Sequence, residues 1–259
     1  MKKTKKYLIS FLNTLKAVGI DVRVMLSYKN IFWYLKTYNE FQRLGGKITA
    51  INMQLTDINS KSGTARGHYF HQDLLVANYI YQNKPIRHID IGSRVDGFVA
   101  HVASFREIEV LDIRDLEDSG HPNIKFLKKD LMSVLGDDSE VADSISCLHA
   151  IEHFGLGRYG DKVSPEGHVQ GLKNIVTMLK KNGILYISFP IGVRSEVHFN
   201  AHRIFEPTEI LSWAKELGLT LINFDYVDLN GNLQRKWDLD KLIIKDNLSC
   251  GIYTFLKNA

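Results

Sequence analysis

The chain has 259 residues, of which 44% are hydrophobic and 24% are charged, with a formal net charge of +4 at pH 7. This size is enough for one large α/β domain with an N-terminal extension, or for two small domains. The mildly positive charge does not require a nucleic-acid partner, and no apolar run reaches the ~18 residues that a membrane span needs. Cys147 and Cys250 lie far apart in apolar segments. This favours buried thiols of a cytoplasmic protein over a disulfide framework.

Residues 1–67 are expected to form an N-terminal helical extension and linker, followed by one domain over residues 68–259. Apolar residues recur at helical spacing behind a basic start in the first segment, which carries Lys2, Lys3, Lys5, Lys6, Leu8, Phe11, Leu12, Leu15 and Val18. Asn13 and Lys16 interrupt the apolar region, which disfavours a signal peptide. A basic amphipathic helix over residues 1–26 is typical of peripheral contact with the inner face of the cytoplasmic membrane. A helix docked on its own domain, or on a second copy in a homodimer, is an equal alternative.

Two further features are expected before the first strand. A second helix is predicted from Ile31 to Leu44, ending at Gly45-Gly46. A dense polar cluster, His68-Tyr69-Phe70-His71-Gln72-Asp73, then precedes a predicted helix from Leu74 to Tyr81. A loop of this kind can cover a cofactor, with Tyr69 as a contact; the alternative is a helix cap with surface histidines.

The stretch from His88 to Arg114 organises the domain. An apolar strand, Ile86–Ile91, enters a turn over Asp90–Gly97, and a helix over Phe98–Phe105 leads to a strand over Glu107–Ile113. This is the start of a nucleoside-binding βαβ unit. Gly92 lets the backbone approach a ligand closely, because it has no Cβ and tolerates a positive φ. Asp112 follows Gly92 by about 20 residues, where an acid accepts hydrogen bonds from ribose hydroxyls.

The turn departs from G-x-G-x-x-G, because Arg94 and Asp96 stand where further glycines are expected. A pyrophosphate would therefore find less backbone to bind. An acid, Asp90, ends the strand instead, and an acid-first turn with few glycines suits a ligand with an amine and no phosphate. S-adenosylmethionine fits that description. The alternative is any doubly wound α/β domain with a tight turn.

Strands and helices continue to alternate after Asp112. Asp130 closes a short strand, where it would either bond an adenine amino group or cap a helix. Two late strands with no long helix between them predict an antiparallel pair at the sheet edge. The predicted strands are Ile124–Leu127, Ser144–Ala150, Ile184–Phe189, Leu219–Val227 and Cys250–Leu256, with helices from Pro165 to Gly183 and from Pro207 to Gly218.

The fourth strand runs into His149, Glu152 and His153, which match the zinc motif H-x-x-E-H. That motif needs a helix to place both histidines on one face. Here it follows an apolar strand, and Gly155 and Gly157 follow at once. No third ligand is evident at a diagnostic spacing, so no metal site is predicted.

Five separated blocks carry a family resemblance: GHYFHQD, DIGSRVDGFVAHVASF, CLHAIEHFGLGRYGD, ISFPIG and FNAHRIF. Residues 68–257 resemble class I S-adenosylmethionine-dependent methyltransferases, and more narrowly an uncharacterised family often encoded among bacterial surface-polysaccharide genes. The resemblance implies a Rossmann-like α/β fold with a seven-stranded, mostly parallel sheet whose last strand is antiparallel. It also places Gly92 near the methionine part of the cofactor, Asp112 at the ribose and Asp130 near the adenine.

Candidate site residues follow from these positions. Cofactor contacts are expected from Asp90, Gly92, Ser93, Arg94, Gly97, Asp112, Asp130, His149 and Tyr69. His153 is the first choice for a general base, with Glu152 orienting its ring and raising its pKa. His202 is the second choice, and His198 lies beside it in sequence. Arg158, Arg194 and Arg203 are candidates for holding an anionic acceptor.

The predicted function is O-methylation of a sugar or glycan precursor in bacterial surface-polysaccharide synthesis. The alternative is a non-catalytic methyltransferase-like module that binds a partner in an envelope glycan assembly complex. A nicotinamide-dependent sugar oxidoreductase is a weaker third hypothesis, because the chain lacks both G-x-G-x-x-G and a Tyr-x-x-x-Lys pair.

Overall fold

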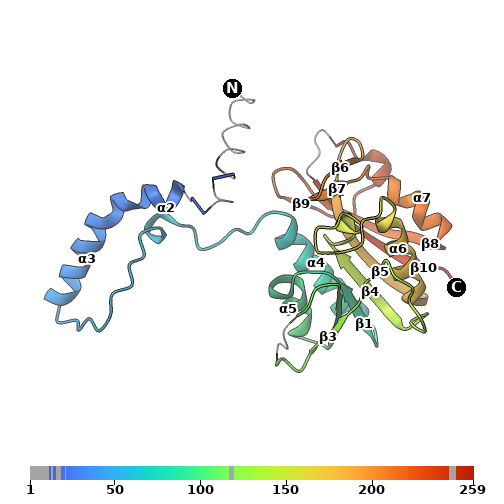
Figure 1. Cartoon of the computed structure of the whole chain (residues 1–259), viewed down its shortest axis with the longest axis horizontal. Helices are drawn as coiled ribbons and strands as arrows, with labels where there is room; N and C mark the ends of the chain where they lie inside the picture. Colours follow the sequence, from blue (N-terminus) through green and yellow to red (C-terminus); the bar gives the residue numbers. More distant parts are fainter. Residues whose placement is uncertain (1–11, 13, 16–18, 21, 117–119, 245–248) are drawn as a thin grey trace. The chain divides into compact units, whose positions relative to one another are not determined.

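The computed structural model describes residues 12, 14–15, 19–20, 22–116, 120–244 and 249–259 (Figure 1). The chain divides into two compact units, Met1–Thr64 and Ala65–Ala259. Most of the predicted basic amphipathic helix over residues 1–26 lies outside the described residues, so its membrane contact stays a prediction. Within the described part of the chain, every helix is too short or too polar to cross a bilayer.

The first unit is helical where it is regular. Helix α2 spans Val22–Ser27, a 3₁₀ turn follows over Tyr28–Asn30, and α3 spans Ile31–Arg43. The Leu44 N–H closes α3 on the Glu40 carbonyl, and Gly45 follows with φ 88°. Only glycine adopts that backbone at no steric cost, which explains why the helix ends here. The predicted helix is therefore confirmed to within one residue.

The second unit is built on a sheet of eight strands in the order β3-β2-β1-β4-β5-β10-β8-β9. β1 to β5 run parallel, while β10 lies antiparallel between β5 and β8, as the predicted antiparallel last strand requires. The strands are β1 His88–Ile91, β2 Ile108–Asp112, β3 Ile124–Lys128, β4 Ala142–Leu148, β5 Leu179–Ile191, β8 Leu219–Val227, β9 Leu233–Gln234 and β10 Ser249–Lys257. The predicted count of seven is wrong by one. β9 has only two residues and pairs with β8 across a turn, so it carries no apolar alternation.

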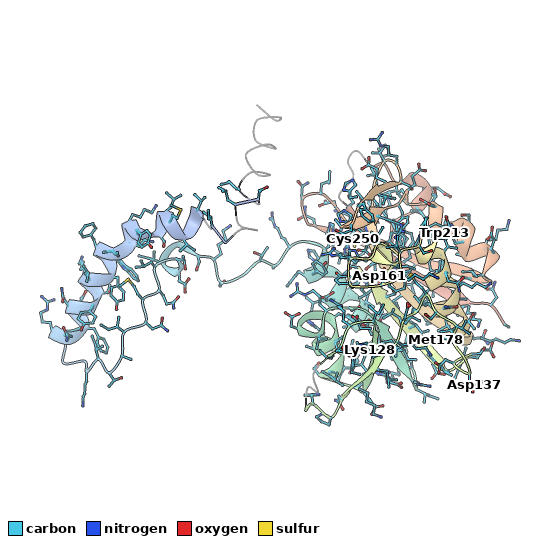
Figure 2. All side chains as sticks on the ribbon, viewed as in Figure 1. Lys128, Asp137, Asp161, Met178, Trp213 and Cys250 are labelled. Atoms are coloured by element: carbon cyan, nitrogen blue, oxygen red, sulfur yellow. The ribbon has the colours of Figure 1, made fainter. Side chains whose placement is uncertain are left out.

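Helices cover both faces of this sheet, and their side chains fill the space against it (Figure 2). On one face, α4 (His68–Asn83) and α5 (Ala100–Ala103) bury Val76, Ile80 and Val102. On the other, α6 (Gly167–Met178) and α7 (Glu209–Glu216) bury Ile175 and Ile210. This three-layer arrangement is the doubly wound α/β fold, in which ligands bind at the carboxyl ends of the strands.

Three element boundaries differ from the sequence predictions. α4 begins at His68, so the polar cluster His68–Asp73 forms its first turns; Gln72 and Asp73 face inward and are buried. The helix predicted over Phe98–Phe105 begins earlier, as a π-helical turn over Val95–Val99, and ends at Ala103. Gly183 does not end a helix: α6 stops at Met178, and Gly183 lies inside β5. β5 begins earlier in the chain than predicted, because its first residue, Leu179, pairs with Ala142 at the start of β4.

Because β10 runs antiparallel to β5, its first residues lie at the same edge of the sheet as the last residues of the parallel strands. We call this edge the working edge of the sheet. Parallel strands end there, whereas β10 begins there, with Ser249 opposite Ile191 at the end of β5. A small separate hairpin of β6 (Glu196–His198) and β7 (His202–Ile204) follows β5. Residues after β1, β2, β3 and β4, at the start of β10 and near the tip of the hairpin are therefore candidates for one site.

Candidate active site

A cavity lies at the carboxyl ends of β1, β2, β3 and β4. Five of the sequence-predicted site residues line it: Gly92, Asp112, Asp130, His149 and His153. The other candidates are not among its described lining residues, and each is placed by different contacts.

The turn after β1 is shaped by Asp90 and Gly92. The Asp90 carboxylate accepts hydrogen bonds from the Ser93 N–H (3.0 Å), the Ser93 hydroxyl (2.7 Å) and the Ser146 hydroxyl (2.6 Å). Asp90 is fully buried, and burial raises its pKa to about 6. Gly92 has φ 66°, and a Cβ at this position would lie 3.1 Å from the Ala150 Cβ. Asp90 and Ser93 thus hold the turn from within, while Gly92 lies at the cavity.

Arg94, Gly97 and Tyr69 lie around this turn. Arg94 forms an ion pair with Asp96 (2.9 Å) and lies over the Tyr69 ring at 5.5 Å. A Cβ on Gly97 would lie 2.8 Å from an Asp73 carboxylate oxygen, so glycine allows α4 to approach. The Tyr69 ring lies 5.1 Å from that of His149. Arg94, which stands where the G-x-G-x-x-G pattern has a glycine, therefore packs its guanidinium on the Tyr69 ring beside this turn.

The acids after β2 and β3 both line the cavity and both already have partners. Arg114 donates its backbone N–H and its guanidinium to Asp112, at 2.8, 2.9 and 2.5 Å. Asp130 accepts from the Met132 N–H (2.8 Å) and the Ser133 hydroxyl (3.0 Å), which is a capping arrangement. At least one hydrogen bond from Arg114 to Asp112 has to break before that carboxylate can accept hydrogen bonds from two hydroxyls.

The segment after β4 holds two buried ionisable groups in contact. His149 has φ 50°, a strained backbone for a residue with a Cβ, and its Nδ1 lies 2.7 Å from the Glu152 Oε1. Burial alone would lower the pKa of His149, but Cys250 and Glu152 outweigh it and raise that pKa well above its ordinary value. Burial opposes ionisation of Glu152, but the His149 ring outweighs it, so the Glu152 pKa is lowered. Each group of the pair therefore favours the charged form of the other.

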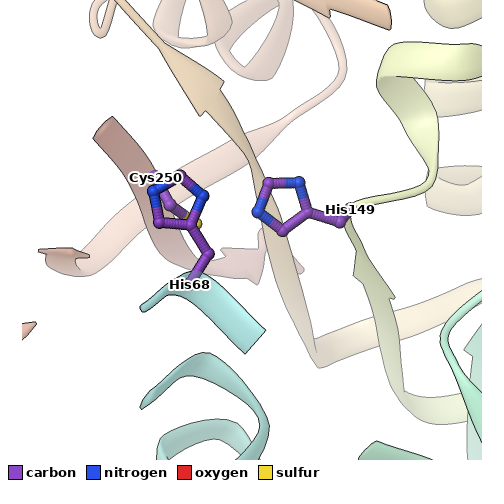
Figure 3. A group of neighbouring side chains, drawn as sticks. All are labelled: His68, His149 and Cys250. Carbon is purple, nitrogen blue, oxygen red and sulfur yellow. The ribbon is translucent and has the colours of Figure 1, made fainter. Parts of the chain in front are cut away.

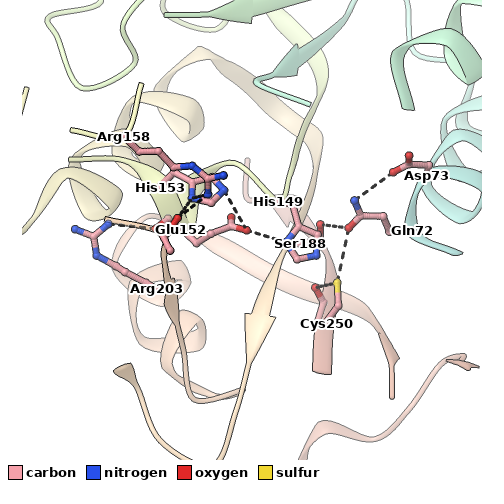
Figure 4. Close-up of polar contacts among 11 residues, drawn as sticks. Gln72, Asp73, His149, Glu152, His153, Arg158, Ser188, Arg203 and Cys250 are labelled. Carbon is pink, nitrogen blue, oxygen red and sulfur yellow. Dashed lines mark hydrogen bonds and ion pairs between the residues drawn. The ribbon is translucent and has the colours of Figure 1, made fainter. Parts of the chain in front are cut away.

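Two buried atoms of this pair have no hydrogen-bond partner among the described residues, namely His149 Nε2 and Glu152 Oε2. Such orphaned polar atoms are rare in folded proteins, and each calls for an explanation such as a ligand. Ile151–His153 is a single 3₁₀ turn rather than an α-helix, so the H-x-x-E-H residues do not place both histidines on one helix face. Glu152 lies between the two histidines instead (Figure 4).

One ring nitrogen of His153 is available to accept a proton. Its Nδ1 donates to the Ala201 carbonyl at 2.7 Å, since a carbonyl can only accept, and this leaves the Nε2 lone pair free in the neutral ring. Nε2 lies 3.9 Å from the Glu152 Oε1. The pKa of His153 is lowered, chiefly by burial and also by Arg158, despite the opposing effect of Glu152. The predicted rise in this pKa is therefore wrong, because desolvation exceeds the attraction of the carboxylate.

His198 and His202 face each other across the β6–β7 hairpin, with ring centroids 5.2 Å apart. His198 Nε2 lies 2.8 Å from a Glu196 carboxylate oxygen, and burial lowers the pKa of His202. The hairpin reaches His153 through the Ala201 carbonyl. His202 is thus a near neighbour of the site, without being among the described residues that line the cavity.

The three arginines considered for an anionic acceptor are already engaged. Arg203 is buried and donates to the carbonyls of Glu152, Phe154, Ser164 and Pro165, so it clamps the segment after β4. Arg158 donates to the Ala201 carbonyl at 2.8 Å, and Arg194 pairs with Glu196 at 2.7 Å. Arg203 therefore has a structural role that its sequence position did not reveal.

Sequence analysis missed several residues that line the cavity, including Arg114, Tyr159 and Asp161. Tyr159 lies under the Arg114 guanidinium at 4.5 Å and beside the His153 ring at 5.6 Å. Asp161 accepts from the N–H groups of Gly155, Gly157 and Tyr159, which folds this glycine-rich segment. An acid that follows closely spaced glycines is the signal that would have indicated this loop.

Comparison with known proteins identifies a family. The model of the family described as "Caenorhabditis protein of unknown function, DUF268" matches residues 102–248, more than half of the chain. No curated protein matches the sequence.

Solved structures share the fold at low sequence identity. The chain is similar to the 1,6-didemethyltoxoflavin-N1-methyltransferase of Burkholderia thailandensis, solved with its substrate and S-adenosylhomocysteine, at TM-score 0.54 and 13% identity over 73% of this chain and 79% of that one. It is also similar to the [4+2]-cyclase SpnF (TM-score 0.53, 13% identity, 90% and 96%). The YcgJ protein of Bacillus subtilis matches at TM-score 0.52 and 12% identity, over 73% and 99%. The second unit therefore has the Rossmann-like methyltransferase fold.

Proposed function

The chain belongs to the DUF268 family of unknown function, and from its site we propose that it is an S-adenosylmethionine-dependent methyltransferase. One observation carries the proposal: the cavity at the strand ends brings Gly92 and Asp112 together in a methyltransferase fold. A cyclase shares this fold, so the fold alone does not fix the reaction, and the argument depends on the site.

The residues present fit this cofactor. A Cβ on Gly92 would lie 3.9 Å from the Asp112 Oδ2, so the missing side chain leaves room for a ligand beside the acid. Asp112 would hold the ribose hydroxyls once Arg114 turns aside, and Asp130, which also lines the cavity, would lie near the adenine. When bound, S-adenosylmethionine supplies an electrophilic methyl group.

His153 is the proposed general base. Its Nε2 lone pair is free in the neutral ring, and its lowered pKa keeps the ring neutral at pH 7. The hydrogen bond from Nδ1 to the Ala201 carbonyl fixes the ring, so Nε2 can accept the proton of an acceptor hydroxyl as the oxygen is methylated. Fixed orientation of this kind accelerates transfer without further protein chemistry.

We propose a hydroxyl of a sugar or glycan precursor as the acceptor. The support is the resemblance to a family encoded among bacterial surface-polysaccharide genes, together with a base, which a hydroxyl needs before it becomes a good nucleophile. A cytoplasmic site, with residues 1–26 at the membrane surface, would place the enzyme beside lipid-linked precursors.

A second function is favoured by one observation. Arg114 engages both carboxylate oxygens of Asp112, which a ribose would need. If this contact is permanent, the domain is a non-catalytic module of an envelope glycan assembly complex, with the cofactor cavity closed.

Binding separates the two functions. We expect calorimetry on the full chain to show S-adenosylmethionine and S-adenosylhomocysteine binding, with no binding of NADH. The Arg114→Ala variant should bind both at least as tightly as the wild type, because its Asp112 is already available. No binding by either protein would sink the enzyme proposal. Production of S-adenosylhomocysteine with individual sugar nucleotides and glycan precursors would then identify the acceptor.

A further inference from the structure

Three metal-ligating side chains from distant parts of the sequence meet at the working edge of the sheet (Figure 3). His68 is the first residue of α4, His149 follows β4, and Cys250 is the second residue of β10. One ring nitrogen from each histidine and the Cys250 Sγ all lie within 4.8 Å of one another. The His68 and His149 rings stack, with centroids 5.4 Å apart.

The second observation is the orphaned nitrogen of His149. Its side chain is only 6% exposed, its Nδ1 is held by Glu152 at 2.7 Å, and its Nε2 has no partner among the described residues. A histidine that binds a metal almost always has its other nitrogen held by a carboxylate or carbonyl. His149 and Glu152 already have that arrangement, and Nε2 is the atom left for an ion, which would displace any proton there.

We propose that His68, His149 and Cys250 bind one zinc ion. Two imidazoles and a thiolate suit zinc, which takes nitrogen and sulfur ligands at about 2.0–2.3 Å in a tetrahedron. Ligand atoms then lie roughly 3.5 Å apart, so the ion has to draw the widest pair together by roughly 1 Å. No zinc site was predicted from the sequence, because these three ligands stand at no recognisable spacing along the chain.

Neighbouring groups support the ligands. Glu152 orients His149, and the Cys250 thiol donates to the Gln72 Oε1 at 3.7 Å (Figure 4). Gln72 is itself held by the Ser188 hydroxyl at 2.7 Å. Removal of such outer partners typically lowers metal affinity by about 10- to 100-fold.

Three protein ligands leave the fourth position open, as in catalytic zinc sites. His149 also lines the cavity proposed for the cofactor, so an acceptor bound at the open position would lie beside the methyl donor. An acceptor oxygen bound there would lose its proton more readily, with His153 receiving it. This role depends on the proposed methyl transfer, whereas zinc binding itself does not.

The test is the zinc content of the full-length protein after zinc loading and dialysis, measured by mass spectrometry. We expect one zinc per wild-type chain and an affinity loss of more than 100-fold in Cys250→Ser and in His68→Gln. Cys147→Ala changes the only other cysteine of the chain, and His71→Gln changes a histidine one turn along α4. Both controls should retain one zinc per chain.

A second measurement covers variants that fail to fold. The zinc-edge X-ray absorption spectrum of the loaded wild type should show one sulfur ligand and nitrogen or oxygen ligands. A wild-type chain that retains no zinc, a bound zinc with no sulfur ligand, or equal retention by Cys250→Ser and Cys147→Ala would overturn the site. Calorimetry with S-adenosylmethionine on zinc-free and zinc-loaded protein tests the proposed function separately, because either ligand can bind without the other.

Discussion

The segments that follow β1 and β4 end neighbouring strands, yet they use their polar groups in opposite ways. After β1, the Asp90 carboxylate is satisfied by Ser93 and Ser146. After β4, the side chains of His149 and Glu152 are 6% and 1% exposed, but each keeps one polar atom unpaired among the described residues. An unpaired buried polar group costs about 1–3 kcal/mol, so the second arrangement is worth keeping only where a ligand or a reaction uses it. The β1 segment supports the cavity, and we propose that the β4 segment supplies its chemistry.

The largest expected effect is on turnover and concerns the β4 segment. His153→Ala should retain the fold and its affinity for S-adenosylmethionine, and it should lose about 100- to 10,000-fold in methyl-transfer rate. The measurement is the initial rate of S-adenosylhomocysteine formation with the acceptor. The matched control is His202→Ala on the hairpin, which should stay within a few-fold of the wild type. If the two variants behave the other way round, His202 is the base.

The second effect is on stability. Arg203→Ala removes the guanidinium that donates to four carbonyls at or near the protein interior, and it should lower the free energy of unfolding by about 3 kcal/mol. Urea unfolding followed by circular dichroism measures the change. Arg194→Ala removes an exposed ion pair and should cost less than about 1 kcal/mol. Equal losses in the two variants would show that the β4 segment needs no clamp.

The third effect is on cofactor binding beside the β1 segment. Asp112→Ala should weaken S-adenosylmethionine binding by about 1–3 kcal/mol, which is the contribution of hydrogen bonds to a charged group. Calorimetry on the folded variant gives the change. Arg114→Ala is the paired variant and should not weaken binding. Unchanged affinity in Asp112→Ala would remove the ribose assignment.

The smallest effect is a pH dependence of stability beneath the β1 segment. His88 is buried between the Ser144 and Ser146 hydroxyls, and burial lowers its pKa to about 3. Between that value and ~6.5, the unfolded chain binds a proton that the folded chain does not. Stability from this group is therefore present above pH ~6.5 and falls by about 1.4 kcal/mol per pH unit as the pH is lowered.

Asp90 acts in the opposite direction, because its raised pKa of about 6 lets the folded chain bind a proton first. The His88 contribution is thus best isolated as a difference. Relative to the wild type, His88→Gln should lose less stability between pH 7 and pH 5 in urea unfolding, while exposed His101→Gln should follow the wild type. Parallel pH profiles for wild type and His88→Gln would contradict the burial argument.

The fold was predictable because its signals are local. Apolar runs of strand length alternate with helical spacing, and the order of these elements fixes a doubly wound sheet. β9 was missed because two residues carry no period. The start of α4 was missed because polar residues stand at its first turns, where the buried positions of Gln72 and Asp73 depend on packing against Ser188 and Gly97.

From the sequence, only those cavity-lining residues that follow the end of a single strand could be predicted. Gly92, Asp112, Asp130, His149 and His153 were located by their positions after strands. The meeting of His68, His149 and Cys250 depends on the order of strands in the sheet, which no spacing records. The pKa of His153 depends on burial beneath the hairpin, so the visible neighbour Glu152 gave the wrong sign.

The position of β10 has a consequence for how the protein is made. β10 lies between β5 and β8, so both neighbours are synthesised first and must leave a gap for it. The ribosome therefore holds an incomplete sheet with two open edges until Ser249–Lys257 have emerged, and such edges invite wrong pairing. Cys250 arrives with this last strand. If the proposed zinc site exists, a nascent chain would hold all three ligands only after β10 has emerged, so loading of the ion would follow completion of the sheet.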